Sequence, residues 1–122
     1  MTQKLGSWGE KEAVHYLESK GYMILERNFN VLEGEIDVIA EKEDCIHFVE
    51  VKTRSSNRCG SPEQSLDLKK QRRLLRAGFE YLDRHLIEGW GFQFDLIAIE
   101  CTPSREVIRL THYQNVIGMD SI

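Results

Sequence analysis

Two acidic residues and a lysine stand inside stretches of sequence that otherwise look suited to burial. Asp37 lies in the apolar run 35–40, and Glu50 and Lys52 lie in the run 46–53. A carboxylate is costly to bury unless it is paired, protonated or bound to a cation. The placement of these three residues therefore indicates a candidate functional site that uses their charges.

A hairpin would bring these side chains onto one face of a sheet. If the two runs pair about a turn centred on Glu43-Asp44, the numbers of opposed residues sum to 87. Asp37 then lies opposite Glu50, and Glu35 lies opposite Lys52. Because side chains alternate along a strand, all four share one face. The other face is mostly core and carries Ile36, Val38, Ala40, His47, Val49 and Val51.

This arrangement predicts a metal site. Opposed side chains start only about 5 Å apart at Cβ, so two carboxylates there need a shared proton or a cation between them. Asp37 and Glu50 offer oxygen ligands of the kind that Mg²⁺ or Mn²⁺ prefers, and the carbonyl of Val51 is a third candidate ligand. Lys52 would stabilise charge on a phosphate or hold the attacking water. The alternative is a salt-bridged hairpin edge, in which Lys52 pairs with Glu35 and Asp37 is solvated.

Basic residues gather directly after this lysine. The chain has 122 residues and a net charge of −4, which argues against indiscriminate binding of nucleic acid. Residues 52–76 nevertheless hold 8 of the 16 Lys and Arg residues and only 2 acidic ones. A basic stripe on an acidic protein can bind phosphate, although a solvated helix face has the same composition.

The hydrophobic pattern predicts a single domain, residues 1–122, of the α/β class. Ser61 to Gln64 has the form of a capping box at a helix start, with a break near Asp67 as an alternative. A helix that crosses between the third and fourth strands makes those strands parallel. The expected elements are a helix over 6–20, strands over 22–30, 35–40 and 46–53, a helix from Ser61 to about His85, and strands over 92–100 and 107–113.

Several other classes of protein are disfavoured. The chain lacks an apolar run long enough to span a membrane, and its N-terminus does not look like a signal peptide. The three cysteines are odd in number and form no CxxC pair, and the four histidines show no metal-ligand spacing. We therefore expect a cytoplasmic protein with reduced thiols and no membrane partner.

The motifs also resemble a known family. "GSWGEKEAVHYLESKGYMILERNFN", "GEIDVIA", "FVEVKTR" and "FDLIAIE" resemble, in this order, the YraN-like family of small bacterial proteins. Asp37, twelve residues, Glu50, Val51 and Lys52 resemble the motif of the PD-(D/E)XK nuclease superfamily. The chain is also similar, more distantly, to the archaeal Holliday-junction resolvases. The resemblance implies a restriction endonuclease-like core in α-β-β-β-α-β order, with an extra C-terminal strand and a mixed central sheet flanked by helices.

The resemblance implies roles for individual residues. Asp37 and Glu50 match the metal-binding acids, and Lys52 matches the motif lysine. Glu10 matches an acid that reaches the metal in resolvase-like members, with an ordinary helix-dipole interaction as the alternative. Lys69 matches a recurring family lysine. The candidate nucleic-acid contacts are Arg54, Arg58, Lys69, Arg72 and Arg73, with Lys70 and Arg76 as further members of a set that also includes plain helix surface.

Two further residues stand out in the fourth predicted strand. The family often has an arginine before the Phe-Asp of this strand, where this chain has Gln93. Asp95 interrupts an otherwise apolar run, and we interpret it as a structural residue that pairs with a basic group.

We therefore expect a Mg²⁺- or Mn²⁺-dependent endonuclease that acts on DNA, with branched DNA as the shape that the resolvase similarity implies. The alternatives are a nucleic-acid-binding module without catalysis and a protein-interaction domain. A resolvase-like enzyme that cuts two strands symmetrically would need a homodimer with two-fold symmetry. Candidate interface elements for such a dimer are Trp8, Trp90 and the C-terminal tail.

Overall fold

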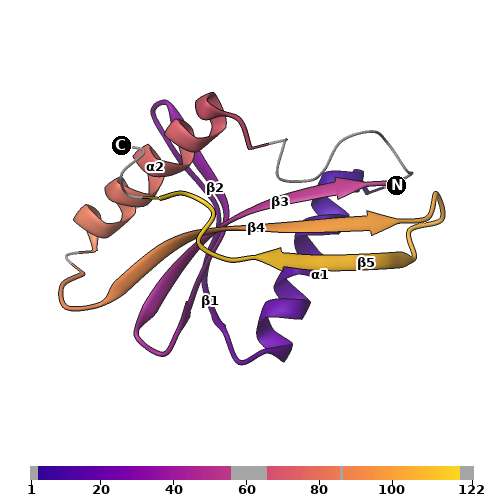
Figure 1. Cartoon of the computed structure of the whole chain (residues 1–122), viewed down its shortest axis with the longest axis horizontal. Coiled ribbons are helices and arrows are strands. Elements are labelled where there is room, and N and C mark those ends of the chain that lie inside the picture. Colours follow the sequence, from indigo (N-terminus) through magenta and orange to yellow (C-terminus); the bar gives the residue numbers. More distant parts are fainter. Residues whose placement is uncertain (1–2, 56–65, 86, 119–122) are drawn as a thin grey trace.

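The protein folds around one five-stranded sheet with a helix on each face (Figure 1). The computed structural model describes residues 3–55, 66–85 and 87–118. The strand order is β1-β2-β3-β4-β5; β3 and β4 run parallel, and the other neighbours run antiparallel. The elements are α1 (Leu5–Ser19), β1 (Met23–Val31), β2 (Gly34–Lys42), β3 (Cys45–Arg54), α2 (Leu68–Arg84), β4 (Gly91–Cys101) and β5 (Val107–Tyr113).

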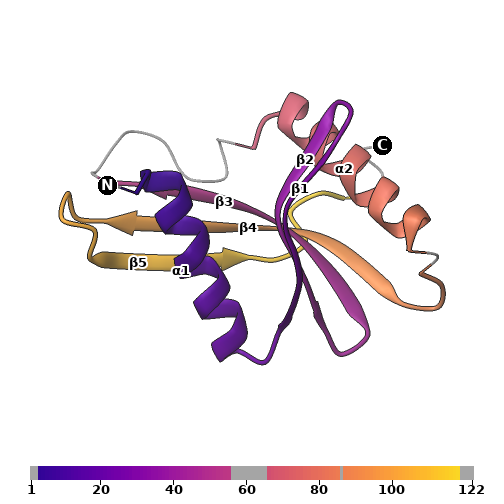
Figure 2. The same cartoon turned by 180° about the vertical axis from the view of Figure 1, so that it is seen from behind.

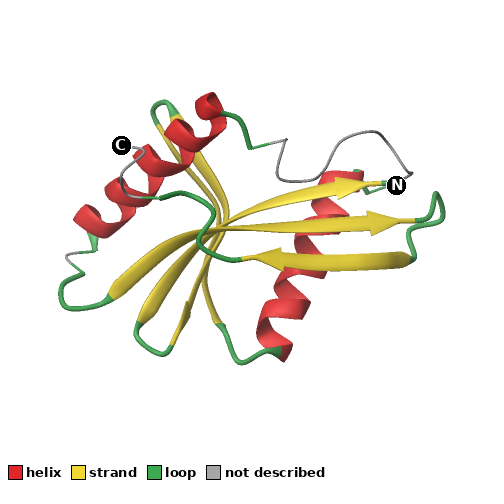
Figure 3. Ribbon diagram, in the orientation of Figure 1, coloured by secondary structure: helices red, strands yellow, loops and turns green. Residues whose placement is uncertain are grey.

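The predicted order of elements is confirmed (Figure 3). α2 connects β3 to β4, and these two strands are parallel as the crossover predicts. The sheet is therefore mixed, and the fold belongs to the α/β class. Within the described residues, no helix is both long enough and apolar enough to cross a membrane.

Two hydrophobic clusters hold the layers together, one on each face of the sheet. α1 crosses the face formed by β3, β4 and β5, as the view from behind shows (Figure 2). Its buried Ala13 and Leu17 pack against Val38, Val49 and Ile97 of the sheet. The cluster under α2 contains Phe29, Ile36, Ile39, Ile46, Phe48, Leu74, Leu75, Ala77, Tyr81 and Phe94. The central strands are therefore buried on both sides, which explains their nearly continuous apolar sequence.

A glycine sets the distance between α1 and the sheet. A Cβ atom on Gly9 would lie 1.8 Å from Oγ1 of Thr53, so only a residue without a side chain fits at this point. α1 consequently lies directly on the end of β3, one residue beyond Lys52. This contact places the next helical residue, Glu10, close to the strands that carry the acidic pair.

The hairpin of β2 and β3 has the predicted turn and register. Glu43 and Asp44 have φ of 51° and 61°, the left-handed backbone that a tight two-residue hairpin turn requires. Pairing runs from Lys42 opposite Cys45 to Val38 opposite Val49, and each pair sums to 87 as predicted. The ladder then ends one residue before Asp37 and Glu50. The strands separate there, so the predicted direct pairing of Asp37 with Glu50, and of Glu35 with Lys52, does not extend into the ladder.

β2 changes the faces of its side chains where it leaves β3. Ile36 packs in the cluster under α2, whereas Val38 and Ala40 pack in the cluster under α1. The prediction that these three share one core face is therefore wrong for Ile36. The change occurs beside Asn28 of β1, which has φ of 52° and lies between the residues paired with Val38 and Ile36. A positive φ in the partner strand locally breaks the regular alternation on which the prediction relied.

α2 begins later than a helix from Ser61 would. Its N-cap is Asp67, whose Oδ1 accepts a hydrogen bond of 2.9 Å from the backbone N–H of Lys70. The alternative prediction, a break near Asp67, thus agrees with the observed start of α2. The predicted capping box at Ser61 to Gln64 lies outside the described residues.

Candidate functional site

The site lies at the fork where β2 and β3 separate. In Figure 1 the β1–β2 hairpin turns toward the start of α2, while β3 continues beside β4 and β5. At the fork, the backbone N–H of Val51 donates to Oδ2 of Asp37 at 2.8 Å. The carboxylate takes the place of the backbone carbonyl that a continuing ladder would supply. Asp37 is therefore held in position by the strand that carries Glu50 and Lys52.

Asp37 and Glu50 form a pair of carboxyl groups that share a hydrogen bond. Burial raises the pKa of both groups, and the neighbouring charge of Asp37 helps to raise the pKa of Glu50 to about 7. The shared hydrogen bond raises the pKa of Glu50 and lowers that of Asp37, so Glu50 holds the proton and Asp37 accepts it. Two acids that lie side by side in a poorly hydrated site are expected to share one proton in this way.

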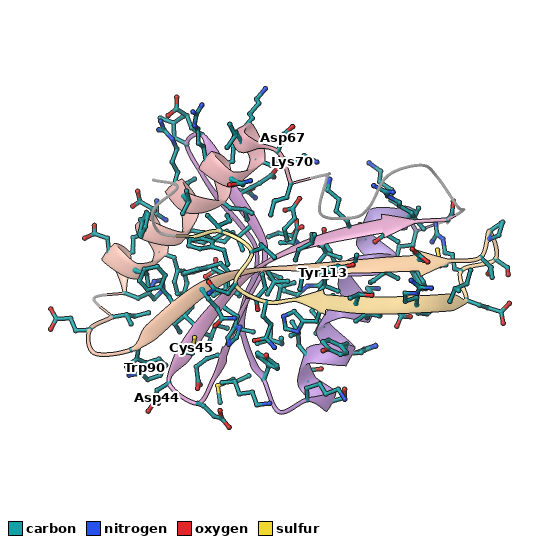
Figure 4. All side chains as sticks on the ribbon, in the orientation of Figure 1. Asp44, Cys45, Asp67, Lys70, Trp90 and Tyr113 are labelled. Carbon is teal, nitrogen blue, oxygen red and sulfur yellow. The ribbon has the colours of Figure 1, made fainter. Side chains whose placement is uncertain are left out.

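Lysines from two elements complete the charged group. Nζ of Lys52 lies 3.8 Å from Oε2 of Glu50. Lys70 of α2 lines the same cleft as Lys52, and the closeness of Lys52, followed by burial, lowers the pKa of Lys70. Asp67 and Lys70 lie at the start of α2, above β3 (Figure 4). The alternative prediction, a salt-bridged hairpin edge in which Lys52 pairs with Glu35, is wrong in its partner. Glu35 pairs instead with Arg73 at 3.5 Å.

Glu50, Lys52 and Lys70 line a cleft of about 350 Å³, whereas Asp37, the other member of the acidic pair, is not among its lining residues. Carboxyl groups from β2 and β3 form one side, and basic side chains of α2 form the other. The lining residues are Glu35, Glu50, Lys52, Asp67, Lys69, Lys70, Arg73 and Leu74. The cleft therefore combines one member of the acidic pair with a basic wall, which suits a phosphate group held next to a cation.

A glycine keeps α2 close to this fork. A Cβ atom on Gly34, the first residue of β2, would lie 2.7 Å from the backbone oxygen of Arg73. The start of β2 and the first half of α2 are thus in direct backbone contact. This contact fixes the distance between the basic wall and the acidic pair.

Glu10 lies near the acidic pair but outside the cleft lining. It faces Arg27 at 3.9 Å, and burial followed by the charge of Asp37 raises the pKa of Glu10. An electrostatic influence of Asp37 on Glu10 agrees with the predicted position beside the site. A ligand role for Glu10, and for the carbonyl of Val51, stays a prediction.

The predicted basic contacts divide into separate groups. Lys69 and Arg73 line both the cleft and a neighbouring hollow of about 280 Å³, whereas Arg72 and Arg76 line only that hollow. Arg76 forms an ion pair with Glu33. Arg54 ends β3, and Arg58 lies outside the described residues.

The sequence predicts less for Lys70 than the structure shows. Lys70 was expected only as one of several helical phosphate contacts, and Lys69 was expected to be the more important residue. The N-cap at Asp67 sets the rotation of the helix, and this rotation turns Lys70 toward Lys52. Asp67 is a typical N-cap residue, and a helix start placed there would have identified Lys70 as a residue of the cleft.

A second polar cluster was missed because its members come from three strands. Oδ2 of Asp95 accepts hydrogen bonds from His47 Nδ1 at 2.7 Å and from His112 Nε2 at 2.8 Å. Oδ1 accepts from the Asn115 backbone N–H and from Gln93 Nε2, both at 2.9 Å. Burial alone would raise the pKa of Asp95, but these four donors hold it well below its usual range. The predicted pairing of Asp95 with a basic group is observed, with two histidines as partners, and its structural role stays a prediction.

The His47–Asp95–His112 cluster has the donor types of a metal site, and its three ligand atoms lie within 4.8 Å of one another. The hydrogen bonds already account for this geometry, because all four acceptor positions of Asp95 are used. Gln93 belongs to this cluster and lines a hollow away from the acidic pair. Gln93, which stands where the resemblance implies an arginine, thus contacts Asp95 and does not line the cleft.

A carboxyl pair, a lysine and a basic cleft at the fork of a mixed α/β sheet define this molecule as a small α/β protein with one charged site. The chain belongs to the YraN-like UPF0102 family: residues 9–99 match the family described as "Uncharacterised protein family UPF0102". It is 41% identical over 117 residues to a UPF0102 protein of Alkaliphilus oremlandii, covering 94% of this chain and 98% of the relative. It is 52% identical over 99 residues to one of Syntrophomonas wolfei, covering 81% and 86%.

The protonation of Glu50 predicts a specific dependence of stability on pH. Glu50 has a pKa of about 7 in the folded protein against an ordinary value of 4.5, so the folded state binds its proton more tightly. The free energy of unfolding should therefore fall as the pH rises from 4.5 to about 7, and then level off. The decrease should be on the order of 1–3 kcal/mol. Urea unfolding in EDTA at a series of pH values measures it.

The matched variant for this measurement is Glu50→Gln, which keeps the shape of the side chain and cannot ionise. The difference in unfolding free energy between the two proteins should change over the same pH range, because titrating groups away from the fork contribute equally to both. A constant difference between the two proteins from acidic to alkaline pH would contradict the assigned proton.

Proposed function

We propose that the protein is a metal-dependent nuclease of the PD-(D/E)XK type that hydrolyses DNA phosphodiesters. The observation that carries this proposal is the fork of β2 and β3, where Asp37 is bonded to the strand of Glu50 and Lys52, and where these last two residues line a cleft. Two acids and a lysine with a basic wall meet the requirements for binding and polarising a phosphate group.

The acidic pair fits a hard divalent cation such as Mg²⁺ or Mn²⁺. Asp37 and Glu50 offer carboxylate oxygens, and the proton that they share occupies the position where a positive charge is needed. A bound cation would replace this proton and supply Lewis-acid polarisation of the phosphate. Asp37 keeps one oxygen bonded to Val51, so the strand itself orients the ligand.

The chain's own residues have defined tasks in the hydrolysis. A water oxygen forms a bond to phosphorus, the ester P–O bond breaks, and a water proton ends on the leaving oxygen. The products are a phosphate monoester and an alcohol. Lys52 presents its ammonium beside Glu50, where it stabilises the negative charge that grows on the phosphate oxygens.

The fold supports the same proposal. The element order and the parallel pair β3–β4, with antiparallel neighbours, are those expected for a restriction endonuclease-like core with an added strand, β5. Asp37 on β2, with Glu50 and Lys52 on β3, are the residues that we assign to the motif. Nuclease-like proteins of this kind act on nucleic acid, and the basic side of α2 gives such a substrate a place to bind.

The test is a cleavage assay on labelled linear, flapped and four-way-junction DNA, with Mg²⁺ or Mn²⁺ and with EDTA as the control. Metal-dependent products are expected, and their yield on each DNA identifies the preferred shape. Absence of cleavage on every substrate would reject the proposal. If the DNA still binds in a salt-dependent way and binding is unaffected by Asp37→Asn, the second candidate function, a non-catalytic binding module, takes its place.

A further inference from the structure

Two lysines from different elements lie beside Glu50 in the cleft. Lys52 comes from β3 and Lys70 from α2, and both side chains line the same cleft. Like charges in contact repel, and more strongly in a partly buried site than in water. α2 and β3 nevertheless hold the two ammonium groups close together. Lys52 and Lys70 are therefore positioned to bind an anion between them.

The acidic groups nearby are already engaged. Glu35 forms an ion pair with Arg73, and Asp67 accepts the backbone N–H of Lys70. Glu50 shares a proton with Asp37. Glu50, whose Oε2 lies 3.8 Å from Nζ of Lys52, is the carboxyl that faces the lysines, and its pKa is raised to about 7. A phosphate from outside would therefore supply negative charge that the protonated Glu50 does not.

We propose that Lys52 and Lys70 form a clamp for one phosphate group, with one lysine at each of two non-bridging oxygens. The clamp rests on the proposed nuclease function for its place in a reaction, and it adds Lys70 as a phosphate-binding residue. The motif of two acids and one lysine does not include this second lysine, which is supplied by the rotation of α2 about its N-cap at Asp67.

Two positive charges match a phosphate that carries two negative charges. A phosphodiester carries one. A second negative charge develops when a water oxygen bonds to phosphorus and gives up its proton, and the monoester product keeps a charge of about −1.5 to −2 at neutral pH. The clamp thus favours the transition state and the phosphate-ended product over the intact diester. The ligand class of the site is a phosphate dianion, and inorganic phosphate is its simplest member.

The experiment compares the wild-type protein with Lys70→Met, and uses Lys20→Met as the matched control. Lys20 is an exposed residue that follows the far end of α1, so its replacement removes the same charge without touching the cleft. Binding of inorganic phosphate in EDTA is measured by calorimetry for all three proteins. We expect Lys70→Met to weaken phosphate binding about tenfold, the effect of losing one charge-assisted hydrogen bond, and Lys20→Met to leave it unchanged.

Cleavage kinetics give a second readout. Lys70→Met should lower kcat by about tenfold or more and change KM little, because the second charge appears only after the diester is bound. Unchanged phosphate binding and unchanged kcat in Lys70→Met would overturn the clamp while leaving the nuclease intact. Lys70-dependent phosphate binding by a protein that cleaves no DNA would keep the clamp and reject the nuclease. A wild-type protein that does not bind phosphate would also overturn the clamp.

Discussion

Asp37→Asn should abolish metal-dependent cleavage, with a loss of at least about 100-fold in rate. The substitution removes the negative charge that holds the cation, while its remaining amide oxygen still accepts the N–H of Val51. The fork should therefore keep its geometry, and the loss should be chemical rather than structural. Lys52→Ala should also remove activity, because the ammonium beside Glu50 is lost. Single-turnover cleavage of the best DNA substrate measures both effects.

The matched control is Glu41→Gln, which neutralises another carboxylate of the same strand. Glu41 lies within the regular ladder opposite Ile46, away from the fork. This variant should cleave as the wild type does. Full activity in both Asp37→Asn and Lys52→Ala would show that any cleavage observed takes place elsewhere.

Asp95→Ala should cause a large loss of stability. Asp95 is fully buried and accepts four hydrogen bonds, one from the buried His47 and one from the half-buried His112 among them. Its removal leaves these donors without a partner and opens a cavity. The free energy of unfolding should fall by about 3–5 kcal/mol. Urea unfolding at neutral pH measures the difference.

Two further variants separate the causes of this loss. Asp95→Asn should be milder than Asp95→Ala, because each histidine can present its unprotonated nitrogen to the amide N–H₂ and the cavity stays filled. Asp83→Ala, an exposed change on α2, should shift the free energy of unfolding by less than about 0.5 kcal/mol. An Asp95→Ala protein as stable as Asp83→Ala would contradict the assigned role of the cluster. Asp95→Asn should also keep normal metal binding, because Asp95 is not part of the cleft.

The parts of this fold that follow from local pattern were predictable. The turn at Glu43-Asp44 and the pairing that sums to 87 depend on alternation along two neighbouring strands, and both are confirmed. The parallel pair β3–β4 follows from a helix between two strands. Asp37 and Glu50 were brought to one place by the same register, even though their strands separate just before them.

The parts that depend on tertiary geometry were not predictable from pattern. The turning of Ile36 to the α2 side requires the irregular backbone at Asn28 in the neighbouring strand. Lys70 reaches Lys52 only because α2 begins at Asp67. Asp95 and His112 lie on neighbouring strands, and their spacing along the chain does not predict the hydrogen bond between them.

The most direct test of the central claim, that the two carboxyls at the fork hold a divalent cation, is Mn²⁺ binding followed by electron paramagnetic resonance. The measurement is best made above pH 7, where Glu50 readily gives up its proton. We predict that the wild-type protein binds Mn²⁺, that Mg²⁺ displaces it, and that Asp37→Asn loses the site while Glu41→Gln keeps it. Mn²⁺ binding that is absent from the wild type, or undiminished in Asp37→Asn, would contradict the proposed metal centre and with it the mechanism that depends on it.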